Sequence, residues 1–154
     1  MIKILFICHG NICRSSAAEF MFKQLIKDKK LTKVFCCDSA ATSYEEIGND
    51  TYPPMKRVLL ENNIDLTRHY ARRMTVEDYN TSDLILCMDE ENMYGINRII
   101  GVDKDKKVYI LPRYVNVNYD EIEDPWYSGR YELVYSQLYE CLNLLINKLL
   151  NKHS

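Results

Sequence analysis

The chain has no long hydrophobic run, no block of basic residues and no leader-like N-terminus. None of its 154 residues lies in an apolar stretch near the roughly 20 residues that a membrane-spanning helix needs. The opening MIKILFICHG reaches histidine and glycine too soon for a signal peptide. Short basic runs and a formal net charge of -2 argue against a nucleic-acid partner. We therefore expect a cytoplasmic protein with no membrane span, in which cysteines are not paired as structural disulfides.

Signatures of metal and nucleotide binding are also missing. The Cys and His residues lack the paired spacing of a zinc site, so we expect no metal and no cofactor. Neither a Walker loop nor a dinucleotide-binding glycine pattern is present. There is no internal repeat, linker or low-complexity segment. The length and the 47% hydrophobic fraction favour a single domain over residues 1–154, with one core large enough to need no disulfide.

Short apolar runs alternate with stretches of helical periodicity. Strands are predicted at residues 2–7, 33–38, 83–88 and 107–111. Helices are predicted at about residues 16–29, 53–61, 89–100 and 130–151, with one helical turn at 75–79 and long loops at 39–54 and 112–129. A capping box of Ser15 or Ser16 with Glu19 is expected to begin the first helix. The alternation predicts an α/β fold: a four-stranded parallel sheet in flavodoxin-like order with helices on both faces.

The loop Cys8-His9-Gly10-Asn11-Ile12-Cys13-Arg14-Ser15 lies between the first predicted strand and the first predicted helix. Ligands of such folds bind at the carboxyl ends of the strands, often in this loop. Successive N–H groups of a loop that enters a helix point toward one spot, and the helix dipole makes that spot electropositive. Residues 8–15 are therefore predicted to form a cradle for a tetrahedral oxyanion.

Cys8 and Arg14 are the candidates for chemistry in this loop. Arg14 can add bidentate hydrogen bonds to an oxyanion, and the same positive field favours the thiolate of Cys8. A thiolate at the floor of an anion cradle suits attack on a phosphoryl group through a covalent thiophosphate. The alternative is a buried cysteine that ends a strand and a surface arginine that opens a helix, although chance rarely produces the C-x5-R-S spacing.

Such a reaction needs a general acid for the leaving oxygen. Asp124 is a candidate because it precedes Pro125 and two aromatic residues, Trp126 and Tyr127, that can wall an aryl leaving group. It follows the fourth predicted strand, from where it can reach the same sheet edge. The chain has 22 acidic residues, and their spacing in the sequence does not identify which of them is the general acid. From these residues alone, a turn-forming Asp-Pro in a solvated loop is therefore the simpler interpretation of Asp124.

Four segments in order, CHGNICRSSAAE, DSAATSYEEIG, ILCMDEEN and EDPWY, resemble the low-molecular-weight protein tyrosine phosphatases over nearly the whole chain. The resemblance implies an enzyme that hydrolyses phosphotyrosine proteins or small aryl phosphates through a cysteinyl-phosphate. It also implies inhibition by phosphate-like oxyanions, and a monomer or weak dimer. Cys8 matches the nucleophile, Arg14 the phosphate-binding arginine, and Asp124 the general acid that later activates water.

The same resemblance assigns supporting roles. The matched residues are Ser15, which hydrogen-bonds the sulfur; Asn11, which is held in a strained conformation; Ser39 and His69, which brace Asn11; and Asp89, an acid near the cradle. The substrate walls are assigned to Tyr44 or Glu45 with Trp126 and Tyr127, and Tyr127 also matches a position that kinases modify.

The remaining cysteines divide by position. Cys13 matches a second loop cysteine, which can trap an oxidised Cys8 as a disulfide or can simply fill space. The others lie in apolar strand or helix patterns and are expected to be buried, inert thiols. They are Cys36, Cys37, Cys87 and Cys141.

Two other functions use the same parts. A thiol-dependent arsenate reductase shares the cradle and the thiolate but needs a close pair of resolving cysteines downstream, and Cys87 is alone in its region. A non-catalytic phosphotyrosine-binding module is favoured by the loss of Cys8, Arg14 or Asp124, and all three are present. The sequence therefore favours the phosphatase.

Overall fold

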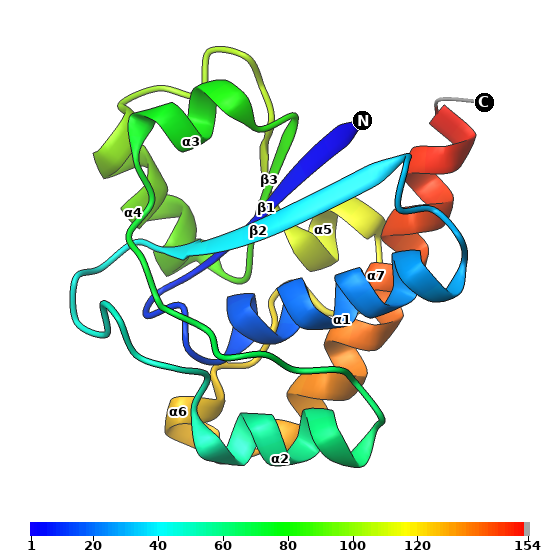
Figure 1. The fold of residues 1–154 in the computed structure, drawn as a ribbon. Coiled ribbons are helices and arrows are strands. Elements are labelled where there is room, and N and C mark those ends of the chain that lie inside the picture. The colour runs from blue at the N-terminus through cyan, green and yellow to red at the C-terminus, as the bar shows by residue number, and fades with distance from the viewer. Residues whose placement is uncertain (153–154) are drawn as a thin grey trace.

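Four parallel strands form the central sheet, in the order β2-β1-β3-β4 (Figure 1). The computed structural model describes residues 1–152. In chain order the elements are β1 (Ile2–Cys8), α1 (Arg14–Asp28), β2 (Phe35–Ala41), α2 (Pro53–Glu61), α3 (Val76–Thr81), β3 (Leu84–Cys87), α4 (Glu90–Ile100), β4 (Val108–Ile110), α5 (Leu111–Val115), α6 (Pro125–Ser128) and α7 (Tyr131–Lys152). The predicted α/β fold with a four-stranded parallel sheet in flavodoxin-like order is confirmed.

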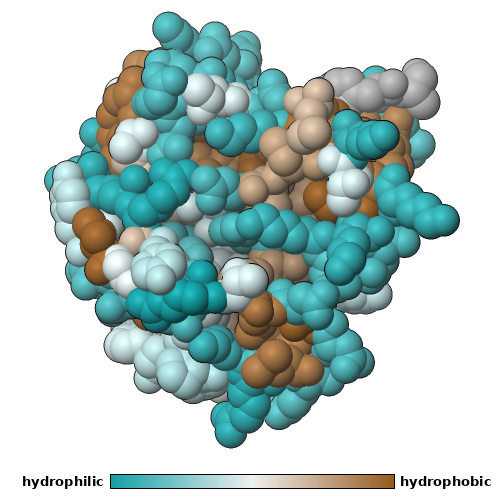
Figure 2. Space-filling view, viewed as in Figure 1, coloured by the Kyte–Doolittle hydropathy of each residue, from teal (hydrophilic) through white to brown (hydrophobic). Residues whose placement is uncertain are grey.

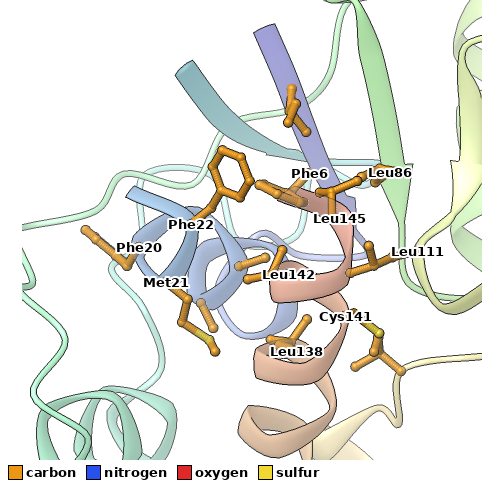
Figure 3. Packing of buried hydrophobic residues seen from close by; sticks show 14 of the residues in the cluster. Phe6, Phe20, Met21, Phe22, Leu86, Leu111, Leu138, Cys141, Leu142 and Leu145 are labelled. Carbon is orange, nitrogen blue, oxygen red and sulfur yellow. The ribbon is translucent and has the colours of Figure 1, made fainter. Parts of the chain in front are cut away.

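Helices cover both faces of the sheet because the central strands are apolar on both sides. Alternate residues of β1 point to opposite faces. On one face Phe6 packs against Phe22 of α1, with ring centroids 5.7 Å apart, and near Leu145 of α7 (Figure 3). On the other face Leu5 belongs to a cluster that includes Ile96 of α4. Figure 1 accordingly shows α1, α2 and α7 on one side of the sheet and α3 and α4 on the other.

Two predictions of secondary structure are wrong: the bounds of the second strand and the loop at residues 112–129. The second strand is not residues 33–38 but Phe35–Ala41, because its carboxyl half continues to pair with β1 as far as Cys8 opposite Ala41. The region predicted as a loop at 112–129 contains α5 and α6. Both begin with a proline in the first turn, where the missing N–H removes no helical hydrogen bond.

The predicted capping box at the start of the first helix is also wrong. Helix α1 already begins at Arg14, with Cys13 at the N-cap and no side-chain cap. The hydroxyl of Ser15 instead faces the sulfur of Cys8, and Glu19 accepts a hydrogen bond from Ser39. The residues that resembled a cap are therefore used to build the neighbouring loop.

The strand order brings distant segments to one edge. β1 ends at Cys8 and β3 at Cys87, and the N–H of Ile122 donates to the carbonyl of Met88 at 2.9 Å. This bond ties the segment that carries Asp124 to the end of β3. On the face drawn in Figure 2, hydrophilic residues separate small apolar patches. No helix within residues 1–152 is long and apolar enough to cross a membrane.

Candidate active site

The sulfur of Cys8 is surrounded by hydrogen-bond donors. The backbone N–H groups of Asn11 and Ser15 lie 3.3 and 3.4 Å from Sγ, and the hydroxyl of Ser15 lies 3.0 Å away. Cys8 is only 4% exposed. Donors that converge on a buried sulfur favour negative charge there, as the curl of the loop into α1 predicts.

Asn11 holds the loop in shape from a left-handed backbone conformation with φ of 61°. Its side-chain amide donates to the hydroxyls of Ser15 and Ser39, both at 2.9 Å. Its backbone carbonyl lies 2.7 Å from Nε2 of His69, and its side-chain oxygen accepts from the N–H of Arg72. Asparagine tolerates positive φ better than most residues, and these contacts over-determine the conformation.

Arg14 is buried, and two carboxylates hold its guanidinium in place. Its Nη1 donates to Asp89 at 2.7 Å and to the carbonyl of Ile122 at 3.0 Å, and its Nη2 lies 3.5 Å from Asp124. Burial alone would lower the pKa of Arg14, but the charges of Cys8, Asp89 and Asp124 outweigh it and raise that pKa. The guanidinium therefore stays charged in the site.

Asp124 stands at the N-cap of α6, where its Oδ1 accepts from the N–H of Trp126 at 3.0 Å. Its side chain is 31% exposed, and with Cys8 and Arg14 it lines a cleft of about 340 Å³. Pocket volumes of a few hundred Å³ suit small ligands. Segments after β1 and after β4 thus meet around one cleft, as predicted for the carboxyl edge.

Of the four residues predicted to form the substrate walls, three line the cleft and one does not. Glu45, Trp126 and Tyr127 line the cleft, and the Trp126 ring lies 5.2 Å from that of Tyr52. Tyr44 does not line it, so its assignment as a wall is not supported. The Tyr44 ring instead lies 4.3 Å from the guanidinium of Arg73, a cation–π contact that holds it outside.

The structure adds residues that sequence reasoning missed. Glu19 is 8% exposed and accepts from Ser39 at 2.5 Å while pairing with Lys23. Its spacing of four from Ser15 places both on one helical face, which is a signal that the sequence contained. Glu46 and Glu91 also line the cleft; both lie in segments that carry the resemblance, but the sequence assigned them no role.

Ser39 links Asn11 to Glu19, so its removal tests the bracing. We expect Ser39→Ala to lower kcat by about tenfold and to destabilise the fold by about 1–3 kcal/mol, because Glu19 and Asn11 each lose a buried partner. Ser82 provides a matched control, since its buried hydroxyl has no hydrogen-bond partner within residues 1–152. Steady-state kinetics and urea unfolding of Ser39→Ala and Ser82→Ala measure the two losses. Equal losses at the two positions would contradict the bracing role of Ser39.

Asp50 fixes the segment that carries His69. It accepts from the N–H of His69 at 2.9 Å and of Thr51 at 2.8 Å, and it pairs with Lys56. Desolvation acts to raise the pKa of Asp50, but the hydrogen bonds from Lys56 and from these two backbone groups prevail and lower it well below its ordinary value. The charged form is therefore the one that stabilises the fold.

We expect Asp50→Asn to reduce the free energy of unfolding by about 1 kcal/mol at neutral pH, discounted for partial exposure. Because the folded pKa lies below the unfolded value of about 3.9, the stabilisation is complete above that value and is lost as pH falls through the folded pKa. Urea unfolding at several pH values checks this. Asp120→Asn, at an exposed aspartate, is the control, and a difference from wild type that stays constant at acid pH would contradict the assignment.

Within residues 1–152, no group of three or more His, Cys, Asp or Glu side chains is arranged to hold a metal ion. All six cysteines are free. Cys87 and Cys141 are fully buried as expected, but the same expectation is wrong for Cys36 and Cys37, which are only half-buried because β2 is an edge strand. The fold and the site together define an α/β protein with a buried thiol, surrounded by hydrogen-bond donors, at the carboxyl edge of its sheet.

Comparison with known proteins identifies the family within that class. Residues 3–154 match the family described as low molecular weight phosphotyrosine protein phosphatase. The mouse (Mus musculus) protein of that name is 38% identical over 149 residues, which cover 94% of each chain. The Bacillus subtilis relative YfkJ, a low molecular weight protein-tyrosine-phosphatase, is 33% identical over 135 residues, 87% of this chain and 86% of its own.

Solved structures agree. The crystal structure of YfkJ from Bacillus subtilis superposes with a TM-score of 0.95 at 29% identity and covers 100% of this chain and 98% of its own. A mutant of the YwlE arginine phosphatase with a phosphorylated active-site serine has a TM-score of 0.86 at 28% identity, over 96% and 95% of the two chains. The chain belongs to the low-molecular-weight phosphotyrosine protein phosphatase family, and it is a hydrolase of the protein tyrosine phosphatase kind.

Proposed function

We propose that this protein, as a single phosphatase domain over residues 1–154, hydrolyses phosphotyrosine and small aryl phosphates through a covalent cysteinyl-phosphate. The observation that carries the proposal is the Cys8 sulfur itself. It lies at the floor of the cleft with three donors around it, in a loop whose Arg14 guanidinium is 3.5 Å from Asp124. Nucleophile, phosphate-binding cation and acid are thus within one small space.

The proposed reaction has two steps. The thiolate of Cys8 attacks phosphorus as the bond to the aryl oxygen breaks, and protonated Asp124 gives its proton to that oxygen. Asp124, now a carboxylate, takes a proton from water as the water attacks the cysteinyl-phosphate, and phosphate leaves. Ser15 donates to the departing sulfur from 3.0 Å. The loop N–H groups of residues 8–15 and Arg14 bind the three phosphoryl oxygens in both steps.

A covalent step also has support from a relative. The mutant YwlE arginine phosphatase carries a phosphoryl group on its active-site serine. If Cys8 occupies the corresponding place in this chain, the same group forms on its sulfur. Under this proposal phosphate-like oxyanions inhibit by occupying the cradle, and no metal takes part. A cytoplasmic location is proposed on the lack of a leader-like segment and of a long apolar run in the sequence, and a monomer or weak dimer is proposed on the sequence resemblance.

We propose Cys13 as a disulfide partner for oxidised Cys8, but only as a slow one. Burial, followed by the charges of Cys8 and Asp124, raises the pKa of Cys13 to about 12. Its thiol is therefore protonated at neutral pH and slow to attack a sulfenic acid. Apolar packing beside Ile12 and Ala71 explains Cys13 equally well.

The arsenate reductase alternative has less support. Such an enzyme needs an accessible second thiol, and Cys87 is fully buried in β3. Burial, with the charge of Asp89 adding to it, raises the pKa of Cys87 well above its usual value. No observation favours this alternative over the phosphatase.

The test is hydrolysis of p-nitrophenyl phosphate and of a phosphotyrosyl peptide in excess chelator. We expect turnover of both, undiminished by chelation and inhibited by vanadate, with little turnover of the matched phosphoseryl peptide. Faster hydrolysis of phosphoarginine than of phosphotyrosine would contradict the substrate class. Thioredoxin-dependent arsenate reduction without phosphatase activity would instead support the alternative.

A further inference from the structure

The mouth of the cleft is acidic although its floor binds an anion. Four carboxylates line it, from Glu45, Glu46, Glu91 and Asp124. They come from three separate segments: the connection after β2, the first turn of α4, and the N-cap of α6. The tertiary fold therefore gathers negative charge around an entrance that a phosphate must pass.

Little positive charge offsets these carboxylates. Arg14 is 2% exposed at the floor and is already shared between Asp89 and Asp124. Glu91 is exposed and forms no ion pair within residues 1–152. Glu45 meets only the imidazole of His9 at 3.0 Å, which is a charged partner only when protonated.

Glu46 completes the acidic rim without a cationic partner of its own. It accepts a hydrogen bond from the neutral side-chain amide of Asn49, at 2.6 Å. A concave surface with one sign of charge focuses its field into solvent, so these groups act on whatever part of a substrate stays at the mouth. The phosphoryl group itself is inside, beside Cys8 and Arg14.

We propose that the enzyme selects phosphotyrosyl peptides with arginine or lysine beside the phosphotyrosine and discriminates against acidic flanking residues. This inference rests on the proposed function. Once the phosphoryl group is in the loop and the aryl ring is at Trp126 and Tyr127, the flanking side chains lie over the rim. Arginine can pair there with Glu45 or Glu91, and its planar group forms two parallel hydrogen bonds to a carboxylate. Aspartate or glutamate at the same place meets like charge.

The experiment uses three phosphotyrosyl peptides that differ only in arginine, glutamine or glutamate at the flanking positions. At low salt we expect kcat/KM to be at least about tenfold higher for the arginine peptide than for the glutamate peptide, mainly through KM. At about 1 M salt, where the screening length is about 3 Å, the ratio should approach one. A salt-independent preference, equal rates or a preference for glutamate would overturn the inference.

Glu91→Gln has a matched control in Glu77→Gln. Both positions are exposed acids in the first turn of a helix, but Glu77 belongs to α3 and does not line the cleft. We expect Glu91→Gln to cut the arginine-to-glutamate ratio by about threefold, Glu45→Gln to act in the same direction, and Glu77→Gln to leave it unchanged. Equal ratios in all three variants would overturn the role of the rim.

Failure of the inference and failure of the proposed function are distinguishable in the same series. p-Nitrophenyl phosphate has no flanking residues and reports the phosphatase chemistry alone. Normal turnover of it together with indifference to peptide charge would overturn only the inference. Absence of its turnover by the folded wild-type protein would overturn the proposed function.

Discussion

Cys8→Ser should reduce kcat for aryl phosphate hydrolysis by at least about 10⁴-fold, as removal of a nucleophile does in other enzymes. The donors around Sγ stabilise a thiolate, but a serine hydroxyl at the same place stays protonated and is a poor nucleophile. Steady-state kinetics with p-nitrophenyl phosphate measures the loss. Substantial turnover by the serine variant would contradict the role of the Cys8 thiolate as the nucleophile.

Two controls separate this loss from misfolding. Cys36→Ser makes the same exchange at a half-buried thiol on β2 and should keep full activity. Cys8→Ser itself should still be stabilised against heat by inorganic phosphate, because the backbone cradle and Arg14 remain and binding to the folded state raises its stability. Loss of that shift would mean that the substitution has collapsed the loop.

Asp124→Asn should cause a loss that grows with the basicity of the leaving group. General acid catalysis typically contributes about 10²–10⁴-fold, and we expect the upper part of that range for phenolic leaving groups similar to tyrosine, whose pKa is about 10. The loss should be smaller for p-nitrophenol, a weaker base that leaves with less help. Asparagine keeps the N-cap of α6, since its side-chain oxygen can accept from the N–H of Trp126.

The measurement is kcat for a series of aryl phosphates with wild type and variant. Asp120→Asn, an exposed aspartate on the same connecting segment, should behave as wild type throughout. Equal losses across all leaving groups would remove Asp124 from the acid role. Such a result would instead point to the electrostatic contact with Arg14 at 3.5 Å.

Local pattern predicted the four strands well, and it failed at details that depend on contacts with other segments. The strand at residues 2–7 was recognisable because a strand buried on both faces is apolar throughout. The second strand was misplaced because Ser39 and the two alanines after it show no strand pattern and are strand only through pairing with β1. Ser15 and Glu19 matched a cap, yet each serves a group from another segment, Cys8 and Ser39 respectively.

The sequence by itself determined the loop around Cys8, because residues 8–15 are contiguous and the directions of their N–H groups follow from one strand entering one helix. It also indicated, through resemblance, that Ser39, His69, Asp89 and Asp124 belong with that loop. Only the tertiary structure decided how they meet. It placed Arg14 between two carboxylates, drew Tyr44 away to Arg73, and gathered Glu46 and Glu91 at the mouth. The reason is physical: contacts between side chains far apart in sequence depend on strand order and packing, which local periodicity does not encode.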